Sequence, residues 1–425
     1  MKLRLLGGLI LWITTAYCAP KARTANRRSQ DGAGHYPELA ALGIRKGATP
    51  ALQAQVGRLT ALLPSIELAR DELRQQGPTL DEKAVHRMAR QLGAEVLTAR
   101  TRALHEYRAG HLPAGQDLDG QHVVAQLDGG RVRTRIQVET KKRKGVKYRR
   151  KIRLEWREPK LLIVYQSDRR GRMVPGTRPW IDGTLEGPDY VMELLAMHLH
   201  RLGAARAQTV TFVSDGAPWI WGRLDWVEKR VGLDPKRVER VLDTCHAVHH
   251  ISLALKALGL SDSERDEKYQ ALRRQLRAGR SRDVVATLRT LAQGQPEDSA
   301  VWVEIEFLHK HEPHMRYDWL KYRGRPLGSG AIESATRRVI NLRLKGNGIY
   351  WREENVEGML VLRAAVLTGR WAEVMAATHE AMREDRRRDW KWSAPDMVAE
   401  LNSGAAIMPP VPQPESSDQT GAIAA

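Results

Sequence analysis

The chain has 425 residues, which is longer than one ordinary compact core and predicts two or three domains. Its 42% hydrophobic and 28% charged residues are typical of a globular protein and exclude a wholly disordered one. A net charge of +19 favours a polyanionic partner such as nucleic acid, although ribosomal and membrane-surface proteins share such a charge. Only Cys18 and Cys245 are present, so neither a disulfide framework nor a cysteine zinc site is implied, and a reducing compartment fits.

Residues 1–35 form a basic N-terminal segment with two interpretations. Lys2 and Arg4, followed by the apolar run 5–13, resemble a secretory signal, which would make the chain a secreted cationic protein. Gly7-Gly8 instead splits the run into a buried pair of β-strands, and we favour this interpretation. No other segment approaches the ~18 apolar residues that a membrane span requires. We therefore expect a cytoplasmic protein without a membrane partner.

Residues 36–115 have a helical pattern and predict a helical domain, with DNA binding as its expected role. Gly77-Pro78 breaks the chain, and Thr79 with Glu82 forms a predicted capping box for a further helix. We expect Gly93 to end this helix. Two helices across a sharp turn are typical of a helix-turn-helix unit, and an ordinary helical hairpin fits the pattern equally well.

From His122 the apolar period changes to two, which predicts strands at 123–127, 132–138, 146–156 and 161–166. Residues 131–160 hold 14 Lys or Arg against three Glu, so more than half of the excess charge lies in one hairpin region. Part of this charge is explained by a solvated loop. Another part alternates along one strand and is predicted to follow the phosphates of DNA, namely Arg131, Arg133 and Arg135.

The elements that follow predict an RNase H-like mixed sheet. A helix at 190–202, a strand at 209–213, a helix from Trp219 and a strand at 238–243 complete an order of three strands, helix, strand, helix, strand. A stretch without strand pattern then separates two parts of this core. The expected division is 116–248 for the first part of the core, 249–327 for an all-helical insertion, 328–392 for the last helices of the core and 393–425 for a disordered tail.

Three isolated carboxylates stand at the ends of these elements. Asp128 and Asp215 each end an apolar run, and Glu333 lies in the first turn of a predicted helix. Carboxylates on rigid elements can hold two divalent cations, which is the arrangement that phosphodiester transfer requires. Each has an alternative explanation, because Asp before Gly is common in turns and Glu near a helix start interacts favourably with the helix dipole, here with Arg337 as its i+4 partner.

Other polar residues accompany the three carboxylates. Asp243 and His246 lie three residues apart where a strand leads into a helix, and a packed histidine or a metal ligand would both fit. The helix from Ala331 is expected to pack through Ile332, Ala335, Val339 and Leu342. Its other face and the turn beyond it supply further predicted DNA contacts, namely Arg337, Arg338, Lys345 and Trp351, although core packing is the commoner role for a tryptophan.

Four motifs resemble those of bacterial insertion-sequence transposases of the ISKra type, which belong to the DDE class with an RNase H-like core. These are LDGGRVR at 127–133, SDGAPWI at 214–220, GSGAIES at 328–334 and RLKGNG at 343–348. The Asp243-Thr244-Cys245-His246 element is similar to the Asp-x-x-His element of DDE transposases with a helical insertion. The likeness extends from about Tyr36 to Trp392 and is most specific at 328–334.

The resemblance implies a mobile-element enzyme that cuts DNA at insertion-sequence ends and joins the 3′-hydroxyl to target DNA. It assigns Asp128, Asp215 and Glu333 as catalytic ligands of two Mg²⁺ ions, for which Mn²⁺ can substitute, and gives Asp243 and His246 a supporting role. The implied partners are double-stranded terminal repeats, target DNA and further copies of the chain, at the bacterial nucleoid. The alternative is a non-catalytic DNA-binding protein derived from a transposase, and related transposases often have more chain before Tyr36, so an internal start at Met1 is an expectation.

Overall fold

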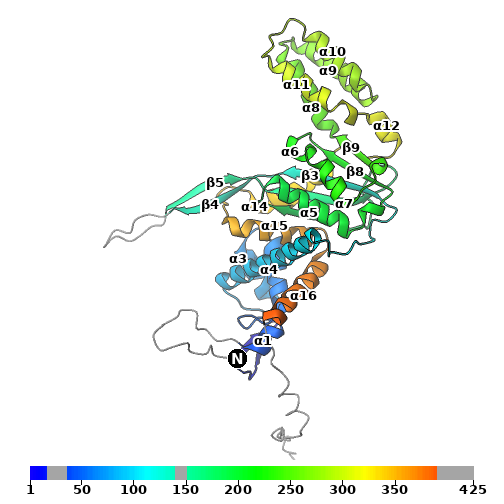
Figure 1. Ribbon diagram of the computed structural model, residues 1–425. Coiled ribbons are helices and arrows are strands. Elements are labelled where there is room, and N and C mark those ends of the chain that lie inside the picture. The colour runs from blue at the N-terminus through cyan, green and yellow to red at the C-terminus, as the bar shows by residue number, and fades with distance from the viewer. Residues whose placement is uncertain (17–35, 139–150, 390–425) are drawn as a thin grey trace, which may run out of the picture.

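A five-stranded mixed sheet forms the centre of the molecule (Figure 1). The computed structural model describes residues 1–16, 36–138 and 151–389. The strand order is β7–β6–β3–β8–β9, with β6 antiparallel to β3 and β7, and β8 parallel to β3 and β9. The fold is therefore mixed α/β, as predicted. The strands are β3 (His122–Gly129), β6 (Lys160–Ser167), β7 (Trp180–Thr184), β8 (Thr209–Ser214) and β9 (Val238–Leu242).

Helices cover both faces of this sheet, which explains why its strands are continuous apolar runs. One hydrophobic core lies between the sheet and α5 (Pro188–Arg201), α6 (Pro218–Trp221) and α7 (Leu224–Val231). A larger core on the opposite face includes α8 (Thr244–Ala257), α13 (Gly330–Thr336) and α15 (Glu353–Leu367). Four of the five strands lie where the sequence predicts them. Strand β7 was not predicted, because only Trp180 and Ile181 form an apolar run there.

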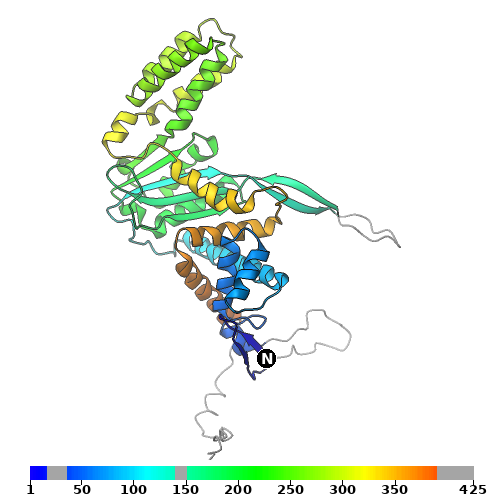
Figure 2. The same cartoon turned by 180° about the vertical axis from the view of Figure 1, so that it is seen from behind.

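A two-stranded arm projects from the sheet (Figures 1 and 2). Its strands β4 (Val132–Val138) and β5 (Lys151–Arg157) continue β3 and β6 beyond a kink, where the amide of Gly130 donates to the Pro159 carbonyl at 2.8 Å. The predicted strand at 132–138 is confirmed. The predicted strand at 146–156 is described only from residue 151, and the rest of it lies outside the described residues.

The N-terminal helices share a core with the last two helices of the described chain. Helices α2 and α4 pack against α15, and α4 also packs against α16. The predicted end at Gly93 is wrong, because α4 continues to Arg108. Gly93 instead allows α4 and α15 to cross closely, since a Cβ there would lie 3.2 Å from the Gly358 Cα. The helices are α1 (Pro37–Ala41), α2 (Pro50–Leu62), α3 (Ile66–Gln75), α4 (Glu82–Arg108) and α16 (Trp371–Asp389).

Two further local predictions need correction. The cap of α4 is Asp81, whose side chain accepts from the Ala84 amide at 2.6 Å, so the predicted capping box of Thr79 and Glu82 does not start this helix. The N-terminal strand pair exists as β1 (Lys2–Arg4) and β2 (Ile10–Trp12), but it is not buried. All three residues of β2 are exposed, and the exposed fraction of Trp12 is 78%.

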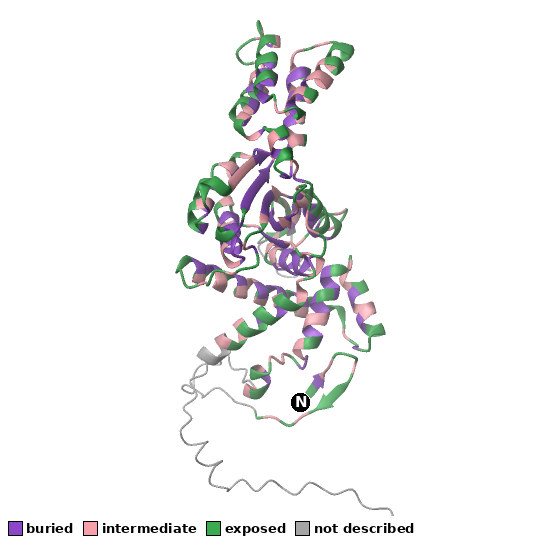
Figure 3. Ribbon diagram, turned by 90° about the vertical axis from the view of Figure 1, so that its right-hand side faces the viewer, coloured by how far each residue is buried: buried purple, intermediate pink, exposed green. Residues whose placement is uncertain are grey.

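A helical lobe rises from the sheet beyond β9 (Figure 1). Its first helix begins at Thr244, five residues before the predicted insertion, because the buried Asp243 side chain caps it directly after the strand. Buried residues line the inner faces of the lobe helices, and exposed residues their outer faces (Figure 3). The lobe comprises α8, α9 (Asp262–Arg277), α10 (Ser281–Leu291), α11 (Ala300–Lys310) and α12 (Tyr317–Tyr322).

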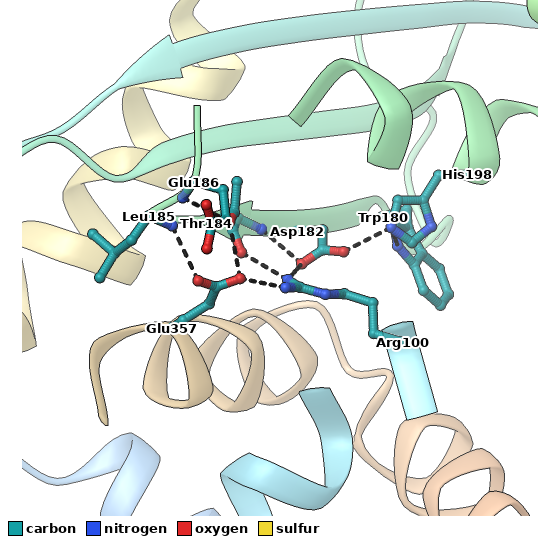
Figure 4. A network of polar contacts seen from close by, with 9 residues as sticks. Arg100, Trp180, Asp182, Thr184, Leu185, Glu186, His198 and Glu357 are labelled. Atoms are coloured by element: carbon teal, nitrogen blue, oxygen red, sulfur yellow. Dashed lines mark hydrogen bonds and ion pairs between the residues drawn. The ribbon is translucent and has the colours of Figure 1, made fainter. Parts of the chain in front are cut away.

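Buried ion pairs connect the N-terminal helices to the sheet (Figure 4). Arg100 of α4 donates to Asp182 of β7 at 3.0 Å and also pairs with Glu357 of α15. Burial opposes ionisation of Asp182, but Arg100 and a 2.8 Å contact with His198 lower its pKa to about 2. Every charge in this group therefore has a partner.

Among the residues that the structure describes, no helix is long and apolar enough to cross a membrane.

Candidate active site

Asp128 lies near the end of β3, on the face that packs against α13. Two positions earlier on the same face, buried Gln126 binds the third motif at two points. Its amide nitrogen donates to the Gly328 carbonyl at 3.1 Å, and its oxygen accepts from the Ile332 amide at 3.0 Å. The first strand of the core thereby holds the start of α13 in place, although 206 residues separate the two partners of the second bond.

Asp215 follows directly after β8, the parallel neighbour of β3. Val213 is paired with Gln126 in the register of these strands, so Asp215 and Asp128 both lie two residues beyond one matched pair. Adjacent strands are about 4.8 Å apart, which brings the two aspartates to the same edge of the sheet. Gly216, with a φ of +90°, then turns the chain towards α6. One oxygen of Asp215 accepts from the Ala217 amide at 3.0 Å and fixes this turn.

Glu333 projects from the first turn of α13 and is exposed. One of its oxygens accepts from the Ser329 hydroxyl at 3.0 Å. Thr336, one turn further along, donates its hydroxyl to Asp128 at 3.3 Å. Since residues three apart on a helix share a face, Glu333 and Thr336 both lie on the side of α13 that faces Asp128.

The three carboxylates repel one another. Burial is the main cause that raises the pKa of Asp128, and the charges of Asp215 and Glu333 raise it further. Within the described ranges, no Lys or Arg forms an ion pair with any of the three. The three predicted residues are therefore close enough for their charges to influence Asp128.

Asp243 and His246 border this acidic group. The Asp243 side chain is buried, accepts from the His246 amide at 2.9 Å and its ring Nδ1 at 3.1 Å, and also accepts from the Ser329 amide. Burial opposes its ionisation, but these hydrogen bonds lower the pKa of Asp243 to about 2. The hydrogen bond to Asp243 raises the pKa of His246, and the charges of Asp215 and Glu333 add to that effect. Asp243 thus positions both His246 and the start of the third motif.

The predicted DNA contacts lie in different settings. Arg133 is half-buried, donates to the Gly346 carbonyl at 2.9 Å and lies over the Trp156 ring. Trp351 is half-buried against the core beneath Arg343, and its backbone pairs with β4. The remaining five side chains are exposed, namely Arg131, Arg135, Arg337, Arg338 and Lys345. Their contact with DNA stays a prediction.

One predicted packing residue is wrong. Leu342 is 61% exposed, whereas Ile332, Ala335 and Val339 are buried as expected. A π-helical turn at Arg337–Asn341 follows α13, and its wider turn shifts the buried face by one residue to Arg343 and Leu344. Such turns occur often near functional sites, and here the turn follows directly after the residue that contacts Asp128.

Three residues of the site were missed in the sequence, namely Gln126, Ser329 and Thr336. Gln126 is a polar residue inside an apolar strand, at the same-face position before Asp128, and this pattern was available as a signal. Ser329 and Thr336 lie four before and three after Glu333, which is the spacing of helix neighbours. Local spacing alone did not reveal that the partner of Thr336 is 208 residues away.

The residues fit a hard cation in their chemistry but are not closed around one. All three side chains offer carboxylate oxygens, which Mg²⁺ prefers, and their charge lacks a protein counter-ion. In the described part of the chain, however, no group of three or more His, Cys, Asp or Glu side chains is gathered closely enough to hold a metal ion.

A comparison with protein-family models and one with curated proteins both find no match.

Proposed function

We propose that the chain is a DDE transposase, a polynucleotidyl transferase that cleaves DNA at insertion-sequence ends and joins those ends to target DNA. The observation that carries this proposal is that Asp128 and Asp215 lie at the same end of neighbouring strands, while Thr336 hydrogen-bonds the helix of Glu333 to Asp128. In the described residues, no Lys or Arg forms an ion pair with any of the three carboxylates. A folded protein has little structural reason to place like charges together, because their repulsion costs stability. Such an arrangement is typical of a site that meets an external cation.

The order of elements supports an RNase H-like core. Leaving aside the β4–β5 arm, the chain runs through three strands, α5, β8, α6 with α7, and β9, which is the order expected for that fold. The acidic residues lie on the first strand, after the fourth strand of the sheet and on α13 beyond a helical insertion. This placement matches the positions that the resemblance implies for the catalytic residues.

Asp128, Asp215 and Glu333 would hold Mg²⁺ through their carboxylate oxygens. When bound, the metal supplies stabilisation of the charge that develops on the phosphate oxygens. The chain's own residues position this set. Gln126 holds α13 against β3, Thr336 orients Asp128, and Asp243 anchors both Ser329 and His246.

The charge distribution supports DNA as the substrate. More than half of the net charge of +19 lies in residues 131–160, which include the β4–β5 arm. This arm projects from the sheet that carries Asp128. Exposed Arg131 and Arg135 on β4 are available to phosphates there. A homodimer or higher assembly is part of the proposal, because joining requires two element ends together.

The test compares Mg²⁺-dependent nicking of supercoiled plasmid by the wild type and by D128N, D215N and E333Q. We expect each variant to lose nicking while its DNA affinity stays unchanged, since the substitutions remove metal ligands and not phosphate contacts. Glu297→Gln, which changes an exposed carboxylate in the loop between α10 and α11, is the matched control and should nick as the wild type does. Nicking by any of the three variants at the wild-type rate would remove that residue from the site.

A second candidate is a non-catalytic DNA-binding protein derived from a transposase. It is favoured by the absence, in the described residues, of a gathered group of metal-binding side chains. This candidate predicts salt-sensitive DNA binding without nicking in Mg²⁺ or Mn²⁺. The plasmid assay separates the two functions, because only the transposase produces nicked circles.

A further inference from the structure

Helix α9 of the helical lobe ends close to the acidic site. Helix α8 rises from Asp243, and a short loop at 258–261 leads into α9, which runs back beside it (Figure 1). At 1.5 Å per residue, Cys245 lies about 18 Å below the loop on α8, and Arg273 lies about 17 Å below it on α9. The end of α9 is therefore level with the start of α8, at the border of the site.

Two arginines occupy this end of α9 without ionic partners. Arg273 and Arg277 are four residues apart, so they share one face of the helix. Neighbouring Leu272 and Leu276 are buried in the lobe, which fixes the orientation of the helix. Within the described residues, neither arginine forms an ion pair, whereas Arg265 on the same helix pairs with Asp262 at 2.8 Å.

Exposed Cys245 lies within electrostatic range of both these arginines and the acidic residues. Burial raises the pKa of its thiol, Asp243 and Glu333 raise it further, and Arg273 and Arg277 lower it. Cys245 is therefore near both sets of charges. The lengths and packing of α8 and α9 independently place the two arginines at the start of α8, beside the acidic group.

We propose that Arg273 and Arg277 each bind a DNA backbone phosphate beside the acidic site and so position the strand on which the three carboxylates act. The inference rests on the proposed function, because it names the part of the lobe that contacts its substrate. An acidic site repels a phosphate backbone, and two unpaired cations at its border offset that repulsion. The helical lobe would then contact the DNA backbone on one side of the acidic site.

The first test uses Cys245 as a reporter in the C18S variant, where it is the remaining thiol. We expect a mixed-sequence 30-base-pair duplex to slow alkylation of Cys245 at low salt, since the strand would lie over it. Without DNA, R273Q/R277Q should raise the pKa of the thiol and shift the pH profile of alkylation upwards. Alkylation that is unaffected by saturating duplex would overturn the proposal.

The second test measures duplex affinity as a function of salt for R273Q/R277Q. Loss of two phosphate contacts should lower the slope of log Kd against log salt concentration by about 1.8. Arg289→Gln is the matched control, because Arg289 is exposed in the same lobe but lies about 12 Å along α10 from the start of that helix. Equal weakening by R289Q would show a general charge effect and contradict the proposal, as would an unchanged slope in R273Q/R277Q.

The two proposals fail separately. In one case, the chain does not nick DNA, but duplex protects Cys245 and R273Q/R277Q lowers the slope of log Kd against log salt concentration. The proposed nuclease activity then fails while the DNA contact stands. If nicking depends on Asp128 but neither Cys245 nor the slope responds, the function stands and the contact of Arg273 and Arg277 is wrong.

Discussion

Two groups of carboxylates in this protein have opposite surroundings. Asp182 is buried and Glu357 half-buried between β7 and α15; Arg100 pairs with both, and His198 hydrogen-bonds Asp182 (Figure 4). Asp128 and Asp215 lie at a sheet edge and Glu333 on α13, and none of the three has a Lys or Arg partner among the described residues. The pKa of Asp182 is lowered, whereas burial and like charges raise that of Asp128. The first group is built for stability, and the second retains a charge that an external cation can meet.

The largest expected effect breaks the first group. Arg100→Met removes the cation and leaves Asp182 and Glu357 buried without a counter-charge. We expect a loss of about 3–5 kcal/mol in the free energy of unfolding, measured by urea denaturation. Arg108→Ala, which breaks the more exposed pair with Glu193, is the control and should cost much less. An equally small loss for both variants would show that the buried group does not hold the fold together.

The second prediction supplies the acidic group with the cation that it lacks. A ligand that binds only the folded state stabilises it by about 2.7 kcal/mol at a concentration 100 times its Kd. Mg²⁺ should therefore raise the melting temperature of the wild type. The same addition should leave the melting temperature of D128N nearly unchanged. An equal rise in both proteins would place the Mg²⁺ binding elsewhere.

The third prediction is a small gain in stability when Asp128 is replaced, in contrast to the loss expected for Arg100→Met. In the absence of divalent cations, D128N removes a carboxylate that Asp215 and Glu333 repel. The free energy of unfolding at pH 7 should rise, by no more than about 1 kcal/mol because the site is partly solvated. Urea denaturation in EDTA measures this change. A loss of stability would indicate that Asp128 has a structural role like that of Asp182.

The smallest effect is the pH dependence of that gain. The pKa of Asp128 is raised in the folded state, so its ionisation destabilises the fold above that pKa, and protonation relieves the cost as the pH falls. The difference between D128N and the wild type should therefore shrink as the pH falls from 7 towards 4. Asp182 behaves oppositely, since its lowered pKa gives stability that is lost as the pH falls below about 4 towards about 2. A difference that stays constant with pH would contradict the raised pKa.

Much of the fold and the acidic group could be predicted because their signals are local. Short apolar runs mark β3, β6 and β8, and an Asp at or beyond the end of a run marks Asp128 and Asp215. The buried ion pairs of Arg100 gave no such signal, because its partners are 82 and 257 residues away. Gly93 was taken as a helix end because a single sequence does not show which helix crosses there.

The most direct measurement counts Mn²⁺ bound to the protein by electron paramagnetic resonance, in the wild type, in each of D128N, D215N and E333Q, and in the triple variant. Mn²⁺ is a suitable probe because it binds to the oxygen ligands that suit Mg²⁺. We expect bound Mn²⁺ in the wild type, weaker binding in every single variant and none at these positions in the triple variant. Equal Mn²⁺ binding by the wild type and the triple variant would contradict the claim that these three carboxylates form a shared cation site.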